Sequence, residues 1–254
     1  MNEDVKKTHK AITGEGSALT KYQDVIVGSR SLLFLFYYEW CVWLGVIPGA
    51  LGMLFRQIFW PRLFGSCGRK TVFAKGIVLR HPQRIHLGDS VVISEGCILD
   101  GRHYDSGRAI VLGNDVILSN NVILSCKNGF ITIGDSTGIN AGTIVQSTNH
   151  CPVSIGADVI IGQMSFAIGG GDYNIDRLDI PIRLQGIKND GGVTIENNVW
   201  IGAQVTVLGG VQVGAGSVVA AAAVLTRSIP TNSIAKGIPA VVTGTRGEGV
   251  EKCA

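Results

Sequence analysis

The sequence predicts a triangular β-solenoid, a mainly-β fold in which short strands stack in three-sided coils. Glycine supplies 35 of the 254 residues, about twice its usual share of 7%. From Ile195 onward, six consecutive hexads each begin with an aliphatic residue, and the same phase recurs upstream in groups of three hexads. An amphipathic helix would show a period near 3.6 residues and a half-buried strand a period of two. The six-residue step therefore favours the solenoid.

Each group of three hexads is expected to form one coil. Strands of neighbouring coils then pair about 4.8 Å apart, and the first residue of each hexad points inward and stacks with its equivalents. The extra residues between coils all fall at one corner of the prism, and the longest insert is about 173–194. An earlier coil is expected at roughly 68–86. The six phased coils start at Leu87, Leu112, Ile133, Ile155, Ile195 and Val213.

Composition excludes several other classes of protein. Apolar residues make up 46% of the chain and charged residues 16%, which excludes a disordered composition. A net charge of +3 gives no reason to expect a nucleic-acid partner. The six cysteines show no zinc-binding spacing, so no metal is expected, and reduced thiols are typical of a cytosolic protein.

Composition also divides the chain into four stretches. These are a polar N-terminal tail with little order (1–30), an apolar helical segment (31–64), the β-helix (65–245) and a C-terminal tail (246–254). Pro48-Gly49 is expected to separate two short helices in the apolar segment, because both residues interrupt a helix.

The apolar segment 31–64 is expected to lie on a membrane surface. Residues 32–47 are interrupted only by Glu39, but this run is shorter than the roughly 20 residues that a spanning helix needs. Its tryptophans suit the lipid headgroup level, and nearby arginines suit anionic lipid. The alternative is a helical pair packed on the solenoid or on another copy. These residues are Trp40, Trp43, Trp60, Arg56, Arg62 and Arg69.

Residues 193–242 (VTIENNVWIGAQVTVLGGVQVGAGSVVAAAAVLTRSIPTNSIAKGIPAVV) resemble the closing coils of the maltose, galactoside and xenobiotic acetyltransferase group of hexapeptide-repeat acyltransferases. LFGSCGRKTVF and LRHPQRIHLGD resemble members that are placed with exopolysaccharide or lipopolysaccharide assembly. The resemblance implies a left-handed parallel β-helix over about 65–245. It also implies a homotrimer with acetyl-CoA bound between neighbouring subunits.

The same resemblance implies which residues contact the cofactor. Arg227 could pair with a phosphate, although it could equally be a solvated charge at the end of a coil. Trp200 could instead pack on the flank of the prism. The expected cofactor-binding residues are Trp200, Gly202, Ala203, Ala221, Thr226 and Arg227.

Acyl transfer to a sugar hydroxyl needs a general base. The family has a histidine at the start of the long insert, where this chain has Tyr173, with Asp172 and Asp176 beside it. The coil arithmetic puts His150 at the same corner, one coil from Tyr173. Three hypotheses stay open: His150 is the base, Tyr173 works with Asp172 or Asp176 as proton acceptor, or the protein has no catalytic activity.

The sequence therefore predicts a CoA-dependent O-acyltransferase that transfers an acetyl group to a sugar hydroxyl of a surface-polysaccharide or lipid-linked glycan precursor. The alternatives are a catalytically degenerate scaffold or binding protein and an N-acetyltransferase of an amino sugar. We expect a homotrimer with a sugar or glycan acceptor and no nucleic acid. The expected location is cytoplasmic, peripheral on the inner face of the membrane.

Overall fold

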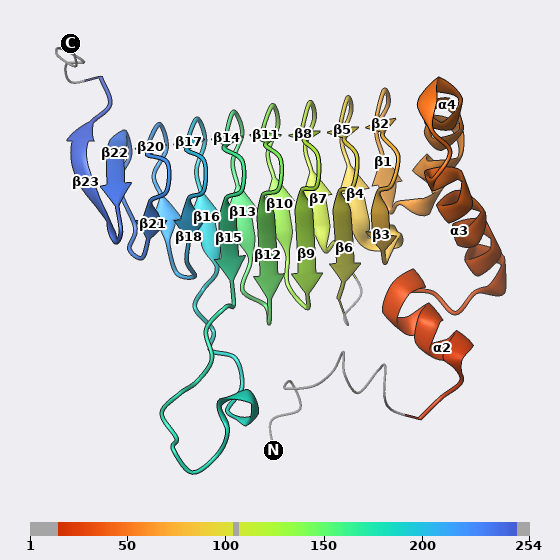
Figure 1. The fold of residues 1–254 in the computed structure, drawn as a ribbon, viewed down its shortest axis with the longest axis horizontal. Helices are drawn as coiled ribbons and strands as arrows, with labels where there is room; N and C mark the ends of the chain where they lie inside the picture. Colours follow the sequence, from red (N-terminus) through yellow and green to blue (C-terminus); the bar gives the residue numbers. More distant parts are fainter. Residues whose placement is uncertain (1–14, 104–106, 248–254) are drawn as a thin grey trace.

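The computed structural model describes residues 15–103 and 107–247, and three sheets in these residues, parallel except at the C-terminal hairpin, confirm the predicted β-helix (Figure 1). Each of seven coils contributes one strand to each sheet, so coil one contains β1, β2 and β3 and coil seven contains β19, β20 and β21. Sheet A contains β1 (Ser66–Cys67), β4 (Ile85–Leu87), β7 (Ile110–Leu112), β10 (Ile131–Ile133), β13 (Val153–Ile155), β16 (Val193–Ile195) and β19 (Gln212–Val213). Sheet B contains β2 (Val72–Phe73), β5 (Val92–Ile93), β8 (Ile117–Leu118), β11 (Gly138–Ile139), β14 (Ile160–Ile161), β17 (Trp200–Ile201), β20 (Val218–Val219), β22 (Ser233–Gly237) and β23 (Ala240–Thr245). Sheet C contains β3 (Val78–Arg80), β6 (Ile98–Arg102), β9 (Ile123–Lys127), β12 (Ile144–Thr148), β15 (Phe166–Gly169), β18 (Thr206–Val207) and β21 (Val224–Leu225).

The core consists of the aliphatic residues that begin each hexad. In sheet A, Leu112 lies in register between Leu87 and Ile133, and the column continues to the last coil. All of these side chains are buried, as are their equivalents in the other two sheets. Coil one starts at Cys67, and Phe73 stands where later coils have Ile, Leu or Val.

The connections from sheet C back to sheet A, here called the C–A corner, contain all the longer inserts, as the sequence predicts. The longest insert covers residues 170–192 and includes η5 (Ile182–Leu184), so it begins a few residues before the expected 173–194. Gly170 has a φ of 75°, and a Cβ there would lie 2.3 Å from the carbonyl oxygen of Thr148. The chain therefore leaves the coil at a position that only glycine fits.

Helices cover the coil-one end of the solenoid, and the predicted helical segment is confirmed (Figure 1). They are α2 (Ala18–Tyr22), the π-helical turn η2 (Gln23–Val27), α3 (Leu32–Gly45), α4 (Gly49–Phe59) and η3 (Trp60–Leu63). Residues 18–27 were expected in a tail with little order, but Val27 is fully buried and the His81 ring donates from Nε2 to the carbonyl oxygen of Asp24 at 3.0 Å. Residues 1–14 and 248–254 of the two expected tails lie outside the described residues.

Two residues expected near lipid are instead part of the protein interior. Arg56 is 1% exposed and donates to the carbonyl oxygens of Phe73 and Ile47 at 2.9 and 2.8 Å. Trp60 is buried and donates from Nε1 to the carbonyl oxygen of Cys41 at 2.9 Å. A buried polar group needs a hydrogen-bond partner. The hydrogen bonds of these two residues therefore join the helices to each other and to coil one.

The outer face of α3 remains apolar although its inner face already packs on the solenoid. Leu33, Phe36 and Trp43 are exposed, while Leu35 and Tyr38 are buried. No single helix in the described part of the chain is long and apolar enough to cross a membrane, but the pair Ala18–Val27 and Leu32–Gly45, bent by 67°, reaches that length and composition together.

The outward-facing positions differ among the three sheets. On sheet A most of them are polar, and on sheets B and C most of them are apolar. In sheet A they are Ser66, His86, Val111, Thr132, Ser154, Thr194 and Gln212. In sheet B they are Val72, Val92, Ile117, Gly138, Ile160, Trp200 and Val218. In sheet C they are Val78, Ile98, Ile123, Ile144, Phe166, Thr206 and Val224.

Candidate functional site

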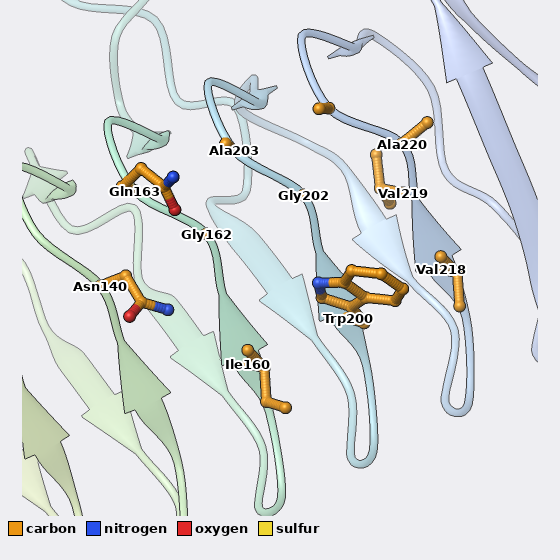
Figure 2. Close-up of a pocket in the computed structure, with 11 residues that line it drawn as sticks. Asn140, Ile160, Gly162, Gln163, Trp200, Gly202, Ala203, Val218, Val219 and Ala220 are labelled. Carbon is orange, nitrogen blue, oxygen red and sulfur yellow. The ribbon is translucent and has the colours of Figure 1, made fainter.

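A groove of about 410 Å³ crosses coils four to seven along sheet B and the turns that lead from sheet B to sheet C, here called the B–C corner (Figure 2). Four of the six expected cofactor-binding residues line it, namely Trp200, Gly202, Ala203 and Ala221. The other lining residues are Asn140, Ile160, Gly162, Gln163, Val218, Val219 and Ala220.

The wall and the floor of the groove follow from the repeat. Trp200 pairs in register with Ile160 and Val218 on the neighbouring strands, and Figure 2 shows its ring between these two side chains. A Cβ on Gly202 would lie 2.5 Å from the backbone nitrogen of Ala221, so coil stacking excludes a side chain at this turn. The result is an apolar wall above a floor of small residues, a shape that fits an extended ligand.

Thr226 and Arg227 do not line this groove. Both are exposed and follow β21, at the opposite end of sheet C from the B–C corner. In a single chain these two residues therefore lie apart from the four that line the groove.

His150 lies at the C–A corner in the turn after β12. Its backbone has a φ of 61° and its side chain is exposed. Nε2 of His150 lies 3.0 Å from Nδ2 of Asn128, and the His150 backbone N–H donates to the Asn128 carbonyl oxygen at 2.7 Å. Asn128 is buried in the equivalent turn of coil three. The buried Asn128 amide thus contacts the imidazole of His150, which the sequence predicts as a candidate general base.

Two aromatic side chains complete this cluster. The His103 ring centroid lies 4.6 Å from that of Phe130 and 6.0 Å from that of His150. Asn128 and Phe130 had no role in the sequence-based site, and the coil arithmetic placed His103 too far away within one subunit. The coil arithmetic could have pointed to Asn128, because it follows its coil start by almost the same number of residues as His150 does.

Tyr173 lies in the same corner, one coil further along. It forms a β-bridge with Ile187, whose carbonyl oxygen accepts from Asn149 Nδ2 at 3.5 Å. Asp172 accepts at its carbonyl oxygen from the Lys188 backbone N–H. Asp172, Tyr173 and Asp176 are all exposed, and no hydrogen bond joins the Tyr173 hydroxyl to either carboxylate in the part of the chain described. The insert therefore brings Tyr173 near the His150 turn without pairing it with a proton acceptor.

The two cysteines at this corner are buried free thiols. Burial raises the pKa of the Cys126 thiol and of the Cys151 thiol, so both remain protonated at neutral pH. Among residues 15–103 and 107–247, no group of three or more His, Cys, Asp or Glu side chains could hold a metal ion.

Comparison with known proteins identifies the repeat. Residues 192–227 match the family described as bacterial transferase hexapeptide (six repeats). The galactoside O-acetyltransferase of Lactococcus lactis is 32% identical over 108 residues, which is 41% of this chain and 51% of that protein. A Saccharomyces cerevisiae protein named as a candidate acetyltransferase is 42% identical over 97 residues, which is 37% of this chain and 50% of that protein. The chain thus spans about half the length of these curated relatives.

Two solved structures share the fold. The polySia-specific acetyltransferase NeuO is 22% identical, with a TM-score of 0.50 over 74% of this chain and 86% of that one. A single-residue mutant of the N-acyltransferase AntD from Bacillus cereus, solved with dTDP and coenzyme A, is 21% identical, with a TM-score of 0.51 over 73% of this chain and 85% of that one. The resemblance to hexapeptide-repeat acyltransferases is confirmed.

Proposed function

We propose that this hexapeptide-repeat protein is a CoA-dependent O-acyltransferase that transfers an acetyl group from acetyl-CoA to a hydroxyl of a surface-glycan precursor. The observation that carries the proposal is that Trp200, Gly202, Ala203 and Ala221 line one groove, since the resemblance implies that all four bind the cofactor. The names of the curated relatives give independent support.

His150 is the proposed general base. Turning the Asn128 amide by half a rotation brings its oxygen toward Nε2. This oxygen then accepts the Nε2–H, and the lone pair on Nδ1 faces the acceptor hydroxyl. His150 takes the hydroxyl proton as the oxygen attacks the thioester carbonyl, the C–S bond breaks, and the proton passes to the departing CoA thiolate. A backbone N–H of the groove stabilises the oxyanion.

A homotrimer would bring the two halves of this site together. The groove lies at the B–C corner and His150 at the C–A corner, so they are separated by the width of sheet C, roughly 15–20 Å at about 3.3 Å per residue. The C–A corner of a neighbouring prism could approach the groove much more closely. The apolar outward positions of sheets B and C favour burial between copies, whereas the polar sheet A favours solvent.

Thiol release from acetyl-CoA tests the proposal directly. We expect the purified protein to bind acetyl-CoA and to release CoA when a mixture of mono- and oligosaccharides is added. Binding without any transfer would instead support the degenerate scaffold, a hypothesis that the replacement of the family histidine by Tyr173 favours. Transfer restricted to amino sugars would support an N-acetyltransferase, and the absence of acetyl-CoA binding would contradict the enzyme altogether.

We further propose that the helical segment attaches the protein peripherally to the inner face of the membrane. On α3, Phe36 is 72% and Trp43 59% exposed. A helix that is apolar on its exposed face as well as on its packed face fits a lipid interface better than water. Arg62 and Arg69 are exposed next to this surface in sequence and suit anionic headgroups. An enzyme bound to the membrane in this way would meet a lipid-linked acceptor on the same membrane surface.

Co-sedimentation with vesicles of phosphatidylglycerol and phosphatidylethanolamine tests this attachment. The full-length double variant Phe36→Glu, Trp43→Glu should bind at least about tenfold more weakly, because burial of each aromatic side chain is worth about 1.5–3 kcal/mol. Leu178→Glu changes a fully exposed leucine of the insert and serves as the matched control. Equal sedimentation of the wild type and the double variant would contradict the proposal.

A further inference from the structure

The C–A corner of coils one to three is rich in positive charge. Among the described residues of this edge, five cationic side chains accompany a single carboxylate, that of Asp100. Asp100 is 2% exposed and pairs with Arg102 at 2.6 Å and with Arg80 at 3.1 Å. Within the described residues, Arg80 and Arg102 share this one carboxylate. The cations are Arg80, Arg84, Arg102, Arg108 and Lys127.

The most informative pair is Arg102 and Lys127, because they lie side by side on paired strands. β6 and β9 bring these two residues into register, at the strand spacing of about 4.8 Å. Like charges at such neighbouring positions destabilise a sheet. Lys127 is exposed and has no ion pair within the described part of the chain, whereas Arg102 directs Nε and Nη2 to Asp100. An anion bound between Arg102 Nη1 and Lys127 Nζ would relieve the repulsion.

This cationic pair lies directly beside the proposed base. The Asn149 backbone N–H donates to the Lys127 carbonyl oxygen at 3.1 Å, and Asn128, the next residue, contacts His150 at 3.0 Å. Lys127 is therefore about one coil spacing from the base, roughly 5 Å, and Arg102 about two, roughly 10 Å. Figure 1 shows the ends of β6, β9 and β12 side by side at this edge, with the insert leaving the end of β15.

We infer that the acceptor is an anionic saccharide whose carboxylate or phosphate binds between Arg102 and Lys127 while its reacting hydroxyl faces His150. The inference rests on the proposed function for the role of His150. The short separation places the anion on the reacting sugar or on the adjoining residue. Arg102 supplies Nη1–H donors and Lys127 a point charge, a combination that accepts either a carboxylate or a phosphate.

Binding of three simple sugars tests the inference without any need for catalysis. Dissociation constants of glucuronate, glucose 1-phosphate and glucose are measured by saturation-transfer NMR on the full-length protein. We expect at least one anionic sugar to bind about tenfold more tightly than glucose, the size of one charge-assisted contact. A preference for glucuronate would indicate an acidic glycan, and a preference for glucose 1-phosphate would indicate a sugar phosphate.

Variants of Lys127 tie the preference to this site. Lys127→Gln should reduce the affinity for the anionic sugar to that for glucose, and Lys127→Arg should retain it. Lys75→Gln, an exposed lysine at the B–C corner of coil one, should leave the preference unchanged. Equal binding of the three sugars, an unchanged preference in Lys127→Gln, or equal competition by inorganic phosphate alone would overturn the inference.

Titration of the same samples with acetyl-CoA separates this inference from the proposed function. Acetyl-CoA binding together with equal affinity for the three sugars would leave the acyltransferase standing and remove the anionic acceptor. An anionic preference that depends on Lys127, together with no acetyl-CoA binding, would keep the saccharide site and remove the acyltransferase.

Discussion

The B–C corner and the C–A corner carry the two halves of the proposed site, and they are built differently. At the B–C corner the turns repeat from coil to coil, and the Gly162 and Gly202 backbone N–H groups donate to carbonyl oxygens of the next coil at 2.8 Å. At the C–A corner the connections differ in length, and the functional groups are side chains. Under the proposed function, the regular corner provides the groove for the cofactor and the irregular corner provides the side chains for the chemistry.

The backbone conformation makes the C–A corner suitable for polar side chains. The turn residues His81, Asn128 and His150 have φ values of 49°, 61° and 61°, in the left-handed region that most side chains avoid and that Asn and His adopt more readily than most. Such a turn therefore favours residue types that also donate and accept hydrogen bonds. The B–C corner has left-handed residues as well, Met164 and Gln204 among them, so this conformation alone does not distinguish the two corners.

The proposed function assigns the chemistry to His150 at the C–A corner, so its removal should give the largest effect on activity. His150→Ala should lower acetyl transfer by about 10²–10⁴-fold, the usual contribution of a general base, while acetyl-CoA affinity stays unchanged. Steady-state thiol release and calorimetric titration measure the two quantities. Tyr173→Phe is the matched variant and should retain most of the activity. A loss of transfer in Tyr173→Phe, with His150→Ala active, would move the base into the insert.

A substitution at the other corner should reduce binding rather than chemistry. Ala221→Glu puts bulk and negative charge into the groove, and we expect acetyl-CoA affinity to fall about 10–100-fold, the equivalent of roughly 1.4–2.8 kcal/mol. Thr194→Glu adds the same charge on the outward face of sheet A, away from the groove, and should not change the affinity. If both variants bind acetyl-CoA as the wild type does, the groove is not the cofactor site.

The regular corner was predictable from the sequence because stacking dictates it. Trp200, Gly202 and Ala203 belong to uninterrupted hexads, so their register with neighbouring coils follows from counting. Thr226 and Arg227 were expected to share the cofactor site, but they follow a sheet C strand and lie outside the groove of this chain. Their role came from a resemblance between sequences, which carries no information on which subunit completes a site.

The irregular corner was predictable only in part. Counting brought His150 and Tyr173 to one corner, but the direction of a loop side chain does not follow from periodicity. Hence the contact between Asn128 and His150 and the approach of the His103 ring were missed. The burial of Arg56 was missed for a related reason, since a charge in an apolar run suggests lipid headgroups unless the carbonyl oxygens that accept from it are known.

Removal of the amide that holds His150 should have a smaller effect than removal of His150 itself. Asn128→Gly retains the left-handed backbone conformation and loses the contact with Nε2. We expect kcat to fall about fivefold to tenfold, because one hydrogen bond contributes about 1 kcal/mol, with KM for acetyl-CoA unchanged. Steady-state kinetics measure both constants. An increase in KM for acetyl-CoA would indicate that Asn128 affects cofactor binding. It would contradict the proposal that the C–A corner serves the chemistry and the B–C corner binds the cofactor.

The smallest effect concerns His81, which occupies the C–A corner of coil one and has a structural role. Its pKa is lowered by burial and by Arg84 and Arg102, against the opposing effects of the Asp24 carbonyl oxygen and Asp100. Above pH 6.5 the ring is neutral in both the folded and unfolded states. Below pH 6.5 the unfolded chain binds the proton more readily than the folded chain does. The free energy of unfolding therefore decreases as the pH is lowered. We expect Tm to drop a few degrees more between pH 7.5 and 5.5 in the wild type than in His81→Asn, whose side chain does not titrate and tolerates the left-handed turn. An equal decrease in Tm for the wild type and His81→Asn would contradict the prediction that the folded state holds His81 in its neutral form.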